Sequence, residues 1–340
     1  MCTSLRITAT DHSSVIGRTM EFPTLMNAEL TVIPRGMPLT STAPDDAVGR
    51  AWTSTYGTVG IDAFPKILPG GNYSYTDGMN EKGLYGGLLY HPGFCEFSTT
   101  EGIANDHLVN PLHLIAYVLT TCATVAETRT ALADITVWAY QPNIPVTLYA
   151  HYRFDDVDGD SIVVEWDHGV MRIFDNPIGV MTNSPNFDWH LTNLRNYINL
   201  RAEAVSAVKI GDVELAPLGI GTSMRGLPGD PTPPARFVRA VALSATAKPS
   251  PDATGAENMM LHLINNFDLP DGFAQASLDP PLEDQTLWST ISNLAERSFS
   301  VRTQADFTFR KIKLSNVDFT GTSIAAHPLP GAADFPEWSL

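Results

Sequence analysis

Segments with strand character stand at both ends of this 340-residue sequence, and helical patterns stand between them. Residues 2–10 and 14–22 alternate apolar and polar side chains around turn residues 11–13, which predicts a hairpin that opens the chain. The C-terminal residues 286–318 are again rich in β-branched and aromatic side chains. Because strands and helices are segregated rather than alternating as βαβ units, the pattern indicates an α+β fold.

The middle of the chain holds the expected helices and further strands. Apolar side chains at helical spacing predict one long helix over 106–135, with Asp106 as its N-cap. Shorter helices are expected over 189–200, 234–245 and 256–267. Further strands are expected over 29–34, 51–61, 84–90, 145–153, 161–166, 170–174 and 178–182. No linker or repeat divides the sequence, so we expect a single domain over 1–340.

Charge and hydropathy exclude several kinds of partner. The formal net charge is -16, from 37 acidic and 21 basic residues, so binding of nucleic acid or of an anionic membrane surface has no electrostatic basis. No run of 18 apolar residues is present, and we expect no membrane span. The N-terminus lacks the basic and apolar regions of a signal peptide. We therefore expect a cytoplasmic protein, or a periplasmic one if an upstream leader was removed.

Motifs of the common nucleotide, hydride and zinc enzymes are missing from the sequence. There is no GxSxG, GxxxxGK[ST], HExxH or GxGxxG after a strand. The run from Asp156 to Asp160 has the acidic spacing of a calcium loop, but Ser161 stands where that loop needs glycine, and Asp167 where it needs glutamate. A solvated hairpin turn explains it better. The nine histidines and three cysteines lack metal-ligand spacing, so we expect no metal and no cofactor.

Cys2 is the most informative single residue. If an aminopeptidase removes Met1, Cys2 carries both a thiol and a free α-amine, and the amine can act as the base for its own thiol. The predicted hairpin brings the end of its second strand opposite the chain start, so Arg18 and Glu21 are expected beside Cys2. Arg18 would favour the thiolate, and Glu21 would hold the charged amine.

Five motifs follow one another along the chain and point to a family. They are MCT at 1–3, GRTMEF at 17–22, DGMNEKGL at 77–84, MTNSP at 181–185, and LPGD at 227–230 with ARFVRA at 235–240. In this order they resemble the choloylglycine hydrolase family, the bile salt hydrolases and penicillin V acylases among the N-terminal nucleophile hydrolases. The resemblance covers nearly the whole chain. It implies a four-layer αββα sandwich with Cys2 at the start of a central strand, and a homotetramer.

The resemblance also implies catalytic roles for residues around the chain start. Cys2 corresponds to the nucleophile, whose α-amine acts first as base and then as acid. Arg18 matches the arginine beside the nucleophile, and Arg236 matches a further active-site arginine. Glu21 stands where the family commonly has an aspartate that contacts the amine. Glutamate keeps the negative charge of aspartate but has a longer side chain, so we expect Glu21 to keep the contact with the amine in an altered geometry.

Two further positions are implied to stabilise the oxyanion of an amide-cleaving reaction. Asn183 matches the asparagine whose side-chain amide donates into the oxyanion hole, and Tyr90 falls where a backbone N–H supplies the second donor. This second position is commonly tyrosine in penicillin V acylases and asparagine in bile salt hydrolases. Tyr90 therefore favours a penicillin V acylase-like enzyme that acts on a small-molecule amide. Conjugated bile salt hydrolysis and acyl-homoserine lactone cleavage are the alternatives.

Aromatic residues are candidates for the pocket that binds the acyl group. Phe22, Phe64, Tyr85 and Trp138 are expected to line it, together with loops 60–72 and 138–145. Two readings without this activity stay open. In one, the protein is a binding or redox-sensing homologue in which Cys2 is an oxidisable thiol. In the other, the change to Glu21 leaves a homologue without activity.

Overall fold

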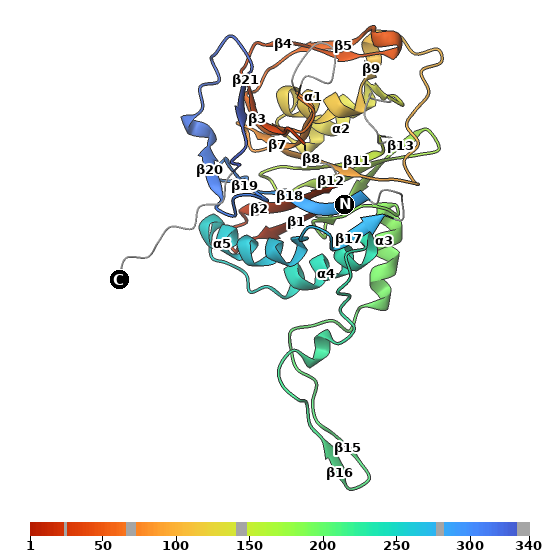
Figure 1. Cartoon of the computed structure of the whole chain (residues 1–340), viewed down its shortest axis with the longest axis vertical. Helices are drawn as coiled ribbons and strands as arrows, with labels where there is room; N and C mark the ends of the chain where they lie inside the picture. The colour runs from red at the N-terminus through yellow and green to blue at the C-terminus, as the bar shows by residue number, and fades with distance from the viewer. Residues whose placement is uncertain (24–25, 66–72, 141–147, 277–281, 332–340) are drawn as a thin grey trace.

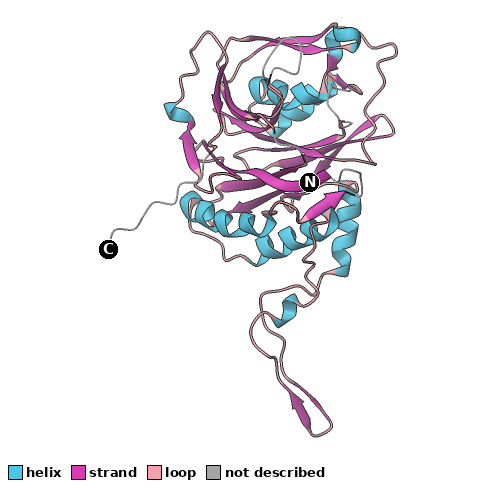
Figure 2. Ribbon diagram, in the orientation of Figure 1, coloured by secondary structure: helices cyan, strands magenta, loops and turns pink. Residues whose placement is uncertain are grey.

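Two β-sheets lie face to face, and helices cover the outer face of each (Figures 1 and 2). The computed structural model describes residues 1–23, 26–65, 73–140, 148–276 and 282–331. Its layers follow the order helices, sheet, sheet, helices, which is the αββα sandwich that the sequence motifs implied. The chain start lies at the centre of these layers (Figure 1).

The first sheet contains strands from both ends of the chain. Its antiparallel order is β14-β1-β2-β18-β19-β20, and β17 pairs with β18. The strands are β1 (Cys2–Thr8), β2 (Ser14–Phe22), β14 (Val180–Met181), β17 (Ala274–Ala276), β18 (Leu282–Asn293), β19 (Ser298–Thr303) and β20 (Arg310–Lys313). Since β18 pairs with β2, a strand near the C-terminus lies directly beside the N-terminal hairpin.

The N-terminal hairpin has the predicted form. In its register Cys2 is opposite Met20, and Ser4 is opposite Arg18. Directly opposed residues of an antiparallel pair point to the same face, so these four side chains share one face of the sheet. That face is the inner one, because Arg18 contacts Asp77 of the second sheet. Period-two alternation has therefore placed the Cys2 thiol between the two sheets.

The second sheet is also antiparallel throughout, in the order β13-β12-β11-β8-β7-β6-β3-β21. Its strands are β3 (Glu29–Ile33), β6 (Thr58–Asp62), β7 (Tyr75–Asn80), β8 (Tyr85–Tyr90), β11 (Ala150–Asp155), β12 (Ser161–Asp167), β13 (Val170–Asp175) and β21 (Ala325–Pro328). Apolar side chains from both sheets, such as Ile16, Met79 and Leu89, fill the space between them. Burial of these residues stabilises the central layer pair.

Helices α3 (Phe187–Asn193), α4 (Pro233–Thr246) and α5 (Ala253–Ile264) cover the first sheet, and α1 (Leu114–Thr121) and α2 (Val125–Ala133) cover the second (Figure 1). α4 begins with prolines, which suit a first helical turn because its N–H groups need no helical partner. α5 packs closely on β2 at Gly17, where a Cβ would lie 2.5 Å from the Met260 Sδ. The absence of a side chain at Gly17 thus leaves room for Met260 of this helix against the strand.

The prediction of one long helix over 106–135 is wrong. The segment forms a 3-10 turn at Asn105–His107, strand β9 (Leu108–Val109), a second turn at Pro111–His113, and then α1 and α2. Pro111 lacks the N–H that a helix interior requires, and β9 pairs in parallel with β10 (Thr136–Val137). Tertiary pairing has overridden the helical spacing, and Asp106 caps no α-helix. The other three helices occur with shifted bounds.

Smaller elements lie outside the two large sheets. β4 (Pro38–Thr42) pairs with β5 (Val48–Thr53), and a second hairpin, β15 (Val208–Ile210) with β16 (Val213–Leu215), projects away from the sandwich (Figure 1). The remaining 3-10 turns are Pro44–Asp46, Leu194–Asn196, Thr222–Met224, Asn265–Phe267 and Leu314–Asn316. Among the described residues, none of the helices has the length and apolar character needed to cross a membrane.

Candidate functional site

Cys2 is buried at the start of β1 with its thiol among sulfur and guanidinium neighbours. The Sγ lies 3.7 Å from the Met20 Sδ and 3.8 Å from the Arg18 Nη2. It borders a narrow apolar pocket of about 30 Å³, which we call the acyl pocket. The lining residues are Cys2, Met20, Phe22, Met26, Phe64, Thr76, Leu88, Tyr90, Leu148 and Tyr149.

Arg18 is fully buried beside the thiol, as the hairpin predicted. Its Nη1 donates to Asp77 Oδ1 at 2.8 Å, and its Nη2 donates to the Leu88 carbonyl at 2.8 Å. Burial alone would lower the pKa of Arg18, but the adjacent Asp77 carboxylate raises it above its ordinary value. The guanidinium therefore stays charged, and a fixed positive charge near a thiol favours the thiolate. Asp77, which holds it there, was not singled out from the sequence.

Asn183 and Arg236 meet at the Cys2 backbone. The Asn183 Oδ1 accepts from the Cys2 N–H at 2.8 Å and from the Arg236 Nη2 at 2.6 Å. Arg236 Nη1 also donates to the Cys2 carbonyl and, at 2.8 Å, to the Thr3 Oγ1. Because two donors face the Asn183 Oδ1, its Nδ2 points the other way. Burial lowers the pKa of Arg236, and the nearby Glu21 carboxylate opposes that effect.

Tyr90 lies beside the donor end of Asn183. The Asn183 Nδ2 donates to the Tyr90 carbonyl at 2.6 Å, which uses one of its two hydrogens. The His91 N–H donates to the carbonyl of Tyr149, the residue just before β11, so the preceding N–H of Tyr90 points away from β11. On that side β7 pairs only with residues 85–87 of β8. The Tyr90 N–H therefore lies beyond the last residue that pairs with β7. Two amide donors thus lie at Tyr90, which lines the acyl pocket.

Glu21 lies beside the chain start, on the opposite face of the sheet from the Cys2 thiol. Its Oε1 accepts from the Thr286 Oγ1 at 2.8 Å. The Met1 ammonium donates to the Glu21 carbonyl at 2.8 Å and to Asp284 Oδ2 at 3.0 Å. Burial raises the pKa of Glu21, and the N-terminal ammonium counteracts it. Asp284 was missed from the sequence because only the pairing of β18 with β2 brings it here.

Of the four aromatic residues expected around the acyl group, two line the acyl pocket and two lie elsewhere. Phe22 and Phe64 are among its lining residues. Tyr85 is fully buried in the core between the sheets, and Trp138 donates its Nε1–H to the Thr42 carbonyl in a separate small cluster. The expectation for Tyr85 and Trp138 therefore has no support in the described part of the chain. Of the two expected loops, residues 66–72 and 141–145 lie outside the described residues.

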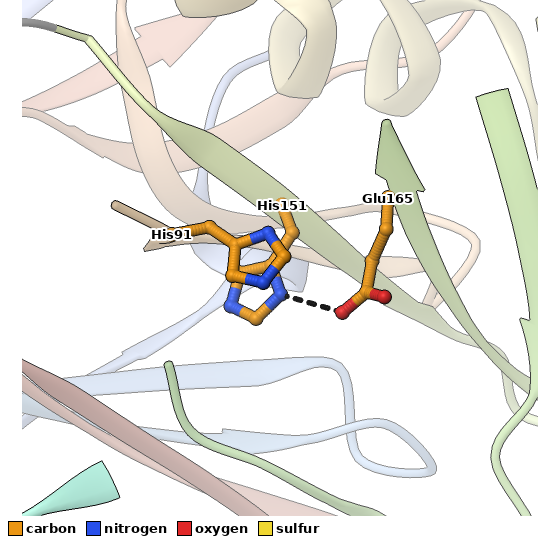
Figure 3. Close-up of side chains that lie close together, drawn as sticks. All are labelled: His91, His151 and Glu165. Atoms are coloured by element: carbon orange, nitrogen blue, oxygen red, sulfur yellow. Dashed lines mark hydrogen bonds and ion pairs between the residues drawn. The ribbon is translucent and has the colours of Figure 1, made fainter. Parts of the chain in front are cut away.

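Two buried histidines hold the backbone that carries Asn183. The His151 Nε2 donates to the Thr182 carbonyl at 3.1 Å, and the His190 Nε2 donates to the Asn183 carbonyl at 2.9 Å. On the other side of its ring, the His151 Nδ1 lies 3.0 Å from the Glu165 Oε1 (Figure 3). Burial lowers the pKa of His151 to about 3 and raises that of Glu165, whose carboxylate oxygens also accept from the Phe187 N–H.

This layer also holds a group of potential metal ligands that the sequence did not reveal. His91, His151 and Glu165 bring their ligand atoms within 4.8 Å of one another. The two imidazole rings are stacked with centroids 4.1 Å apart and planes 10° apart (Figure 3). Because imidazole lone pairs lie in the ring plane, stacked rings do not direct them at one ion. We therefore interpret His151 and Glu165 as a hydrogen-bonded support for the backbone that leads to Asn183, with His91 stacked on the His151 ring.

The candidate calcium loop is a hairpin turn. The Asp156 Oδ1 accepts from the backbone N–H groups of Asp158 and Asp160, at 3.1 and 3.0 Å. Its Oδ2 accepts from the Val125 N–H at 2.8 Å, at the start of α2. The carboxylate is thus occupied by backbone donors, and the turn joins β11 to β12.

Comparisons with known proteins agree with this geometry. Residues 2–326 match the family described as linear amide C–N hydrolases, choloylglycine hydrolase family. The chain is 31% identical over 330 residues to a bile salt hydrolase/transferase of Clostridium perfringens (strain 13 / Type A), covering 96% of each protein. The crystal structure of the mutant C2A conjugated bile acid hydrolase from Clostridium perfringens superposes with a TM-score of 0.87, at 29% identity and full coverage of both chains. The penicillin V acylase from Agrobacterium tumefaciens has the same fold, with a TM-score of 0.76 at 24% identity, covering 96% of this chain and 90% of that one.

Proposed function

Since the chain belongs to the choloylglycine hydrolase family and is a hydrolase of linear amide C–N bonds, we propose that Cys2, freed of Met1, is its nucleophile. The observation that carries this proposal is the position of the thiol. It lies 3.8 Å from a permanently charged guanidinium, and the Cys2 N–H is hydrogen-bonded to the Asn183 amide. Sequence matching alone does not supply that geometry.

The reaction follows from the groups around Cys2. The α-amine takes the thiol proton, and the Sγ attacks the amide carbonyl carbon. The Tyr90 N–H and the second hydrogen of the Asn183 Nδ2 donate to the resulting oxyanion. The C–N bond then breaks as the Cys2 ammonium protonates the leaving amine, which leaves a thioester on Cys2. Water, deprotonated by the same amine, hydrolyses the thioester and releases the acid.

For the substrate, we propose a penicillin V acylase-like preference for an aromatic acyl group. Phe22, Phe64, Tyr90 and Tyr149 contribute aromatic walls to the acyl pocket, and aromatic groups pack favourably against such walls. Because the pocket encloses only about 30 Å³, its walls must move apart when the acyl group enters. The 31% identity to a bile salt hydrolase/transferase favours conjugated bile salts as the second candidate. Long-chain acyl-homoserine lactones are the third.

Steady-state rates on four substrates test this proposal. They are penicillin V, a glycine-conjugated bile salt, a taurine-conjugated bile salt and a long-chain acyl-homoserine lactone. We expect the largest kcat/KM with the phenoxyacetyl amide. Faster cleavage of either bile salt would assign the acyl pocket to a steroid. Absence of turnover with every amide would support the alternative in which the protein is a homologue without catalytic activity.

An Asn183→Ala variant is expected to lower kcat by about a hundred- to a thousandfold, with little change in KM. The variant loses a hydrogen bond that strengthens only when the carbonyl oxygen becomes an oxyanion. Steady-state kinetics on the best substrate measure both constants. Asn186→Ala, three residues on, is the control and should keep the parental kcat. A rise in KM with unchanged kcat would instead assign Asn183 to substrate binding.

A Glu21→Gln variant is expected to move the acidic limb of the kcat/KM pH profile down by about one pH unit. The carboxylate stabilises the protonated α-amine, so its removal lets the amine become the neutral base at lower pH. Glu21→Asp keeps the charge and serves as the control, with its acidic limb near the parental position. If Glu21→Gln and the parent gave the same profile, Glu21 would be a structural residue.

We also propose that the projecting β15–β16 hairpin contacts another copy of the chain in a homotetramer. In its register Val208 is opposite Leu215 and Ile210 is opposite Val213, so four exposed apolar side chains share one face. A two-stranded hairpin is marginal in water alone, and an apolar face favours a partner. Analytical ultracentrifugation should show a tetramer, and Val208→Asp with Ile210→Asp should dissociate it. A parental monomer would reject this assembly.

A further inference from the structure

We infer that the amine half of the substrate binds in the space that Met1 fills, and that Asp284 makes the enzyme favour amides of uncharged or cationic amines. For a given acyl group, an amide whose amine half is anionic, as in glycine or taurine conjugates and in penicillin V itself, would be cleaved more slowly than one whose amine half is neutral or cationic. This inference rests on the proposed function, because it requires Cys2 as nucleophile and the loss of Met1. It concerns the chemical class of the leaving group, which the family assignment leaves open.

The position of the leaving amine follows from the reaction. The group that protonates it must lie within hydrogen-bond reach, and that group is the Cys2 α-amine. One side of the Cys2 nitrogen is taken by the Asn183 Oδ1, at 2.8 Å. Met1 is bonded to the same nitrogen, so its removal opens space directly beside the proton donor. The amine half of the substrate is therefore expected to enter that space.

The Met1 space belongs to a pocket of suitable size and position, which we call the amine pocket. Its volume is about 480 Å³. Phe22 and Tyr90 line both this pocket and the acyl pocket, so the two adjoin at these rings. The other lining residues are Met1, Pro23, Pro231, Thr232, Pro233, Ala274, Gln275 and Asp284. A substrate whose carbonyl lies at Cys2 can thus place its acyl half on one side and its amine half on the other.

The two polar groups that contact the Met1 ammonium in the amine pocket are acceptors. The Asp284 Oδ2 and the Glu21 carbonyl already bind a primary ammonium, that of Met1, at 3.0 and 2.8 Å. The Asp284 Oδ1 is buried and has no hydrogen-bond partner among the described residues. When Met1 leaves, the carboxylate loses its ammonium partner and faces the incoming amine half.

The guanidinium groups of Arg236 and Arg18 already have hydrogen-bond partners. The Nε, Nη1 and Nη2 of Arg236 donate to the Pro231 carbonyl, to the Cys2 carbonyl and to Asn183. Arg18 is paired with Asp77 between the two sheets. Neither guanidinium is among the residues that line the amine pocket. Among the described residues that line the pocket, Asp284 carries the charged side chain, and the Met1 ammonium supplies the compensating charge in the unprocessed chain.

The Asp284 carboxylate lies close enough to the leaving amine to affect its binding. Three bonds join the Met1 and Cys2 nitrogens, so they lie at most about 3.7 Å apart, and Asp284 Oδ2 is within about 7 Å of the Cys2 nitrogen. In a glycine amide the carboxylate is two bonds from the leaving nitrogen. Two anions at this separation in a partly dry pocket repel each other enough to lower kcat/KM by about tenfold. A neutral lactone or amide carries no such penalty.

A matched series of amides tests the inference. Phenoxyacetyl-glycine, phenoxyacetyl-glycinamide and N-(2-aminoethyl)phenoxyacetamide share an acyl group and differ mainly in amine charge, which is negative, neutral and positive. The same three amines carrying a decanoyl group repeat the test for a fatty acyl preference. Each is assayed at low ionic strength with the parent, with Asp284→Asn and with Glu296→Gln. Glu296 is the control, because it is an exposed carboxylate in the turn between β18 and β19 and accepts from the Thr254 Oγ1, away from the amine pocket.

We expect the parent to cleave the neutral and cationic amides about tenfold faster, in kcat/KM, than the glycine amide. Asp284→Asn should reduce that ratio to about threefold or less, mainly by improving cleavage of the glycine amide, while Glu296→Gln keeps the parental ratio. Equal rates for all three charges in the parent would overturn the inference. So would an equal change on all substrates in Asp284→Asn, because that result would place Asp284 on the Cys2 ammonium. Failure to cleave any of the six amides would instead reject the proposed function on which the inference rests.

Discussion

A Cys2→Ser variant is expected to keep its fold and to lose about a thousandfold or more of kcat. The hydroxyl of serine is a much weaker nucleophile than a thiolate near neutral pH, and the guanidinium of Arg18 does not ionise it. The change replaces one sulfur by oxygen at a buried site, so the sheet register is retained. Steady-state kinetics measure the loss, and circular dichroism with thermal unfolding checks the fold.

Cys122→Ser is the matched control for this prediction. Cys122 is also a buried free cysteine, but it lies in the cluster of α1 and the second sheet rather than in the acyl pocket. We expect this variant to retain the parental kcat. A Cys2→Ser enzyme with parental turnover, or equal losses in both variants, would exclude Cys2 as the nucleophile.

Retention of Met1 is expected to reduce kcat nearly as much as loss of the thiol. With Met1 in place the Cys2 nitrogen is an amide, which cannot act as a base or protonate the leaving amine. Met1 also fills part of the amine pocket, with its ammonium on Asp284. The experiment compares a chain cut by a protease to begin at Cys2 with a chain in which an N-terminal tag keeps Met1.

Intact mass spectrometry establishes which N-terminus each sample carries. The chain that begins at Cys2 should turn over its substrate, and the tagged chain should be slower by about a hundredfold or more, since it lacks general acid and base catalysis. Cutting the same tag after the assay should restore the rate. Full activity in a chain with Met1 attached would mean that another group serves as the base.

The successful parts of the sequence interpretation depend on local patterns. The hairpin of β1 and β2 follows from period-two alternation on either side of residues 11–13, and its register places Arg18 and Glu21 near Cys2. The long helix over 106–135 failed for the opposite reason. Its apolar spacing is helical, but Pro111 and the pairing of β9 with β10 interrupt it, and neither effect is visible in the spacing.

The sequence by itself determined the N-terminal hairpin, the two-sheet architecture implied by its motifs, and the identity of the residues around Cys2. The tertiary structure decided what those residues contact. Arg18 meets Asp77 across 59 positions of sequence, and Met1 meets Asp284 across 283. It also decided that Phe22 and Phe64, but neither Tyr85 nor Trp138, line the acyl pocket among the described residues. The physical reason is that alternation along a strand sets only which face a side chain points to, whereas its partners depend on which distant strands pair and on how the two sheets pack.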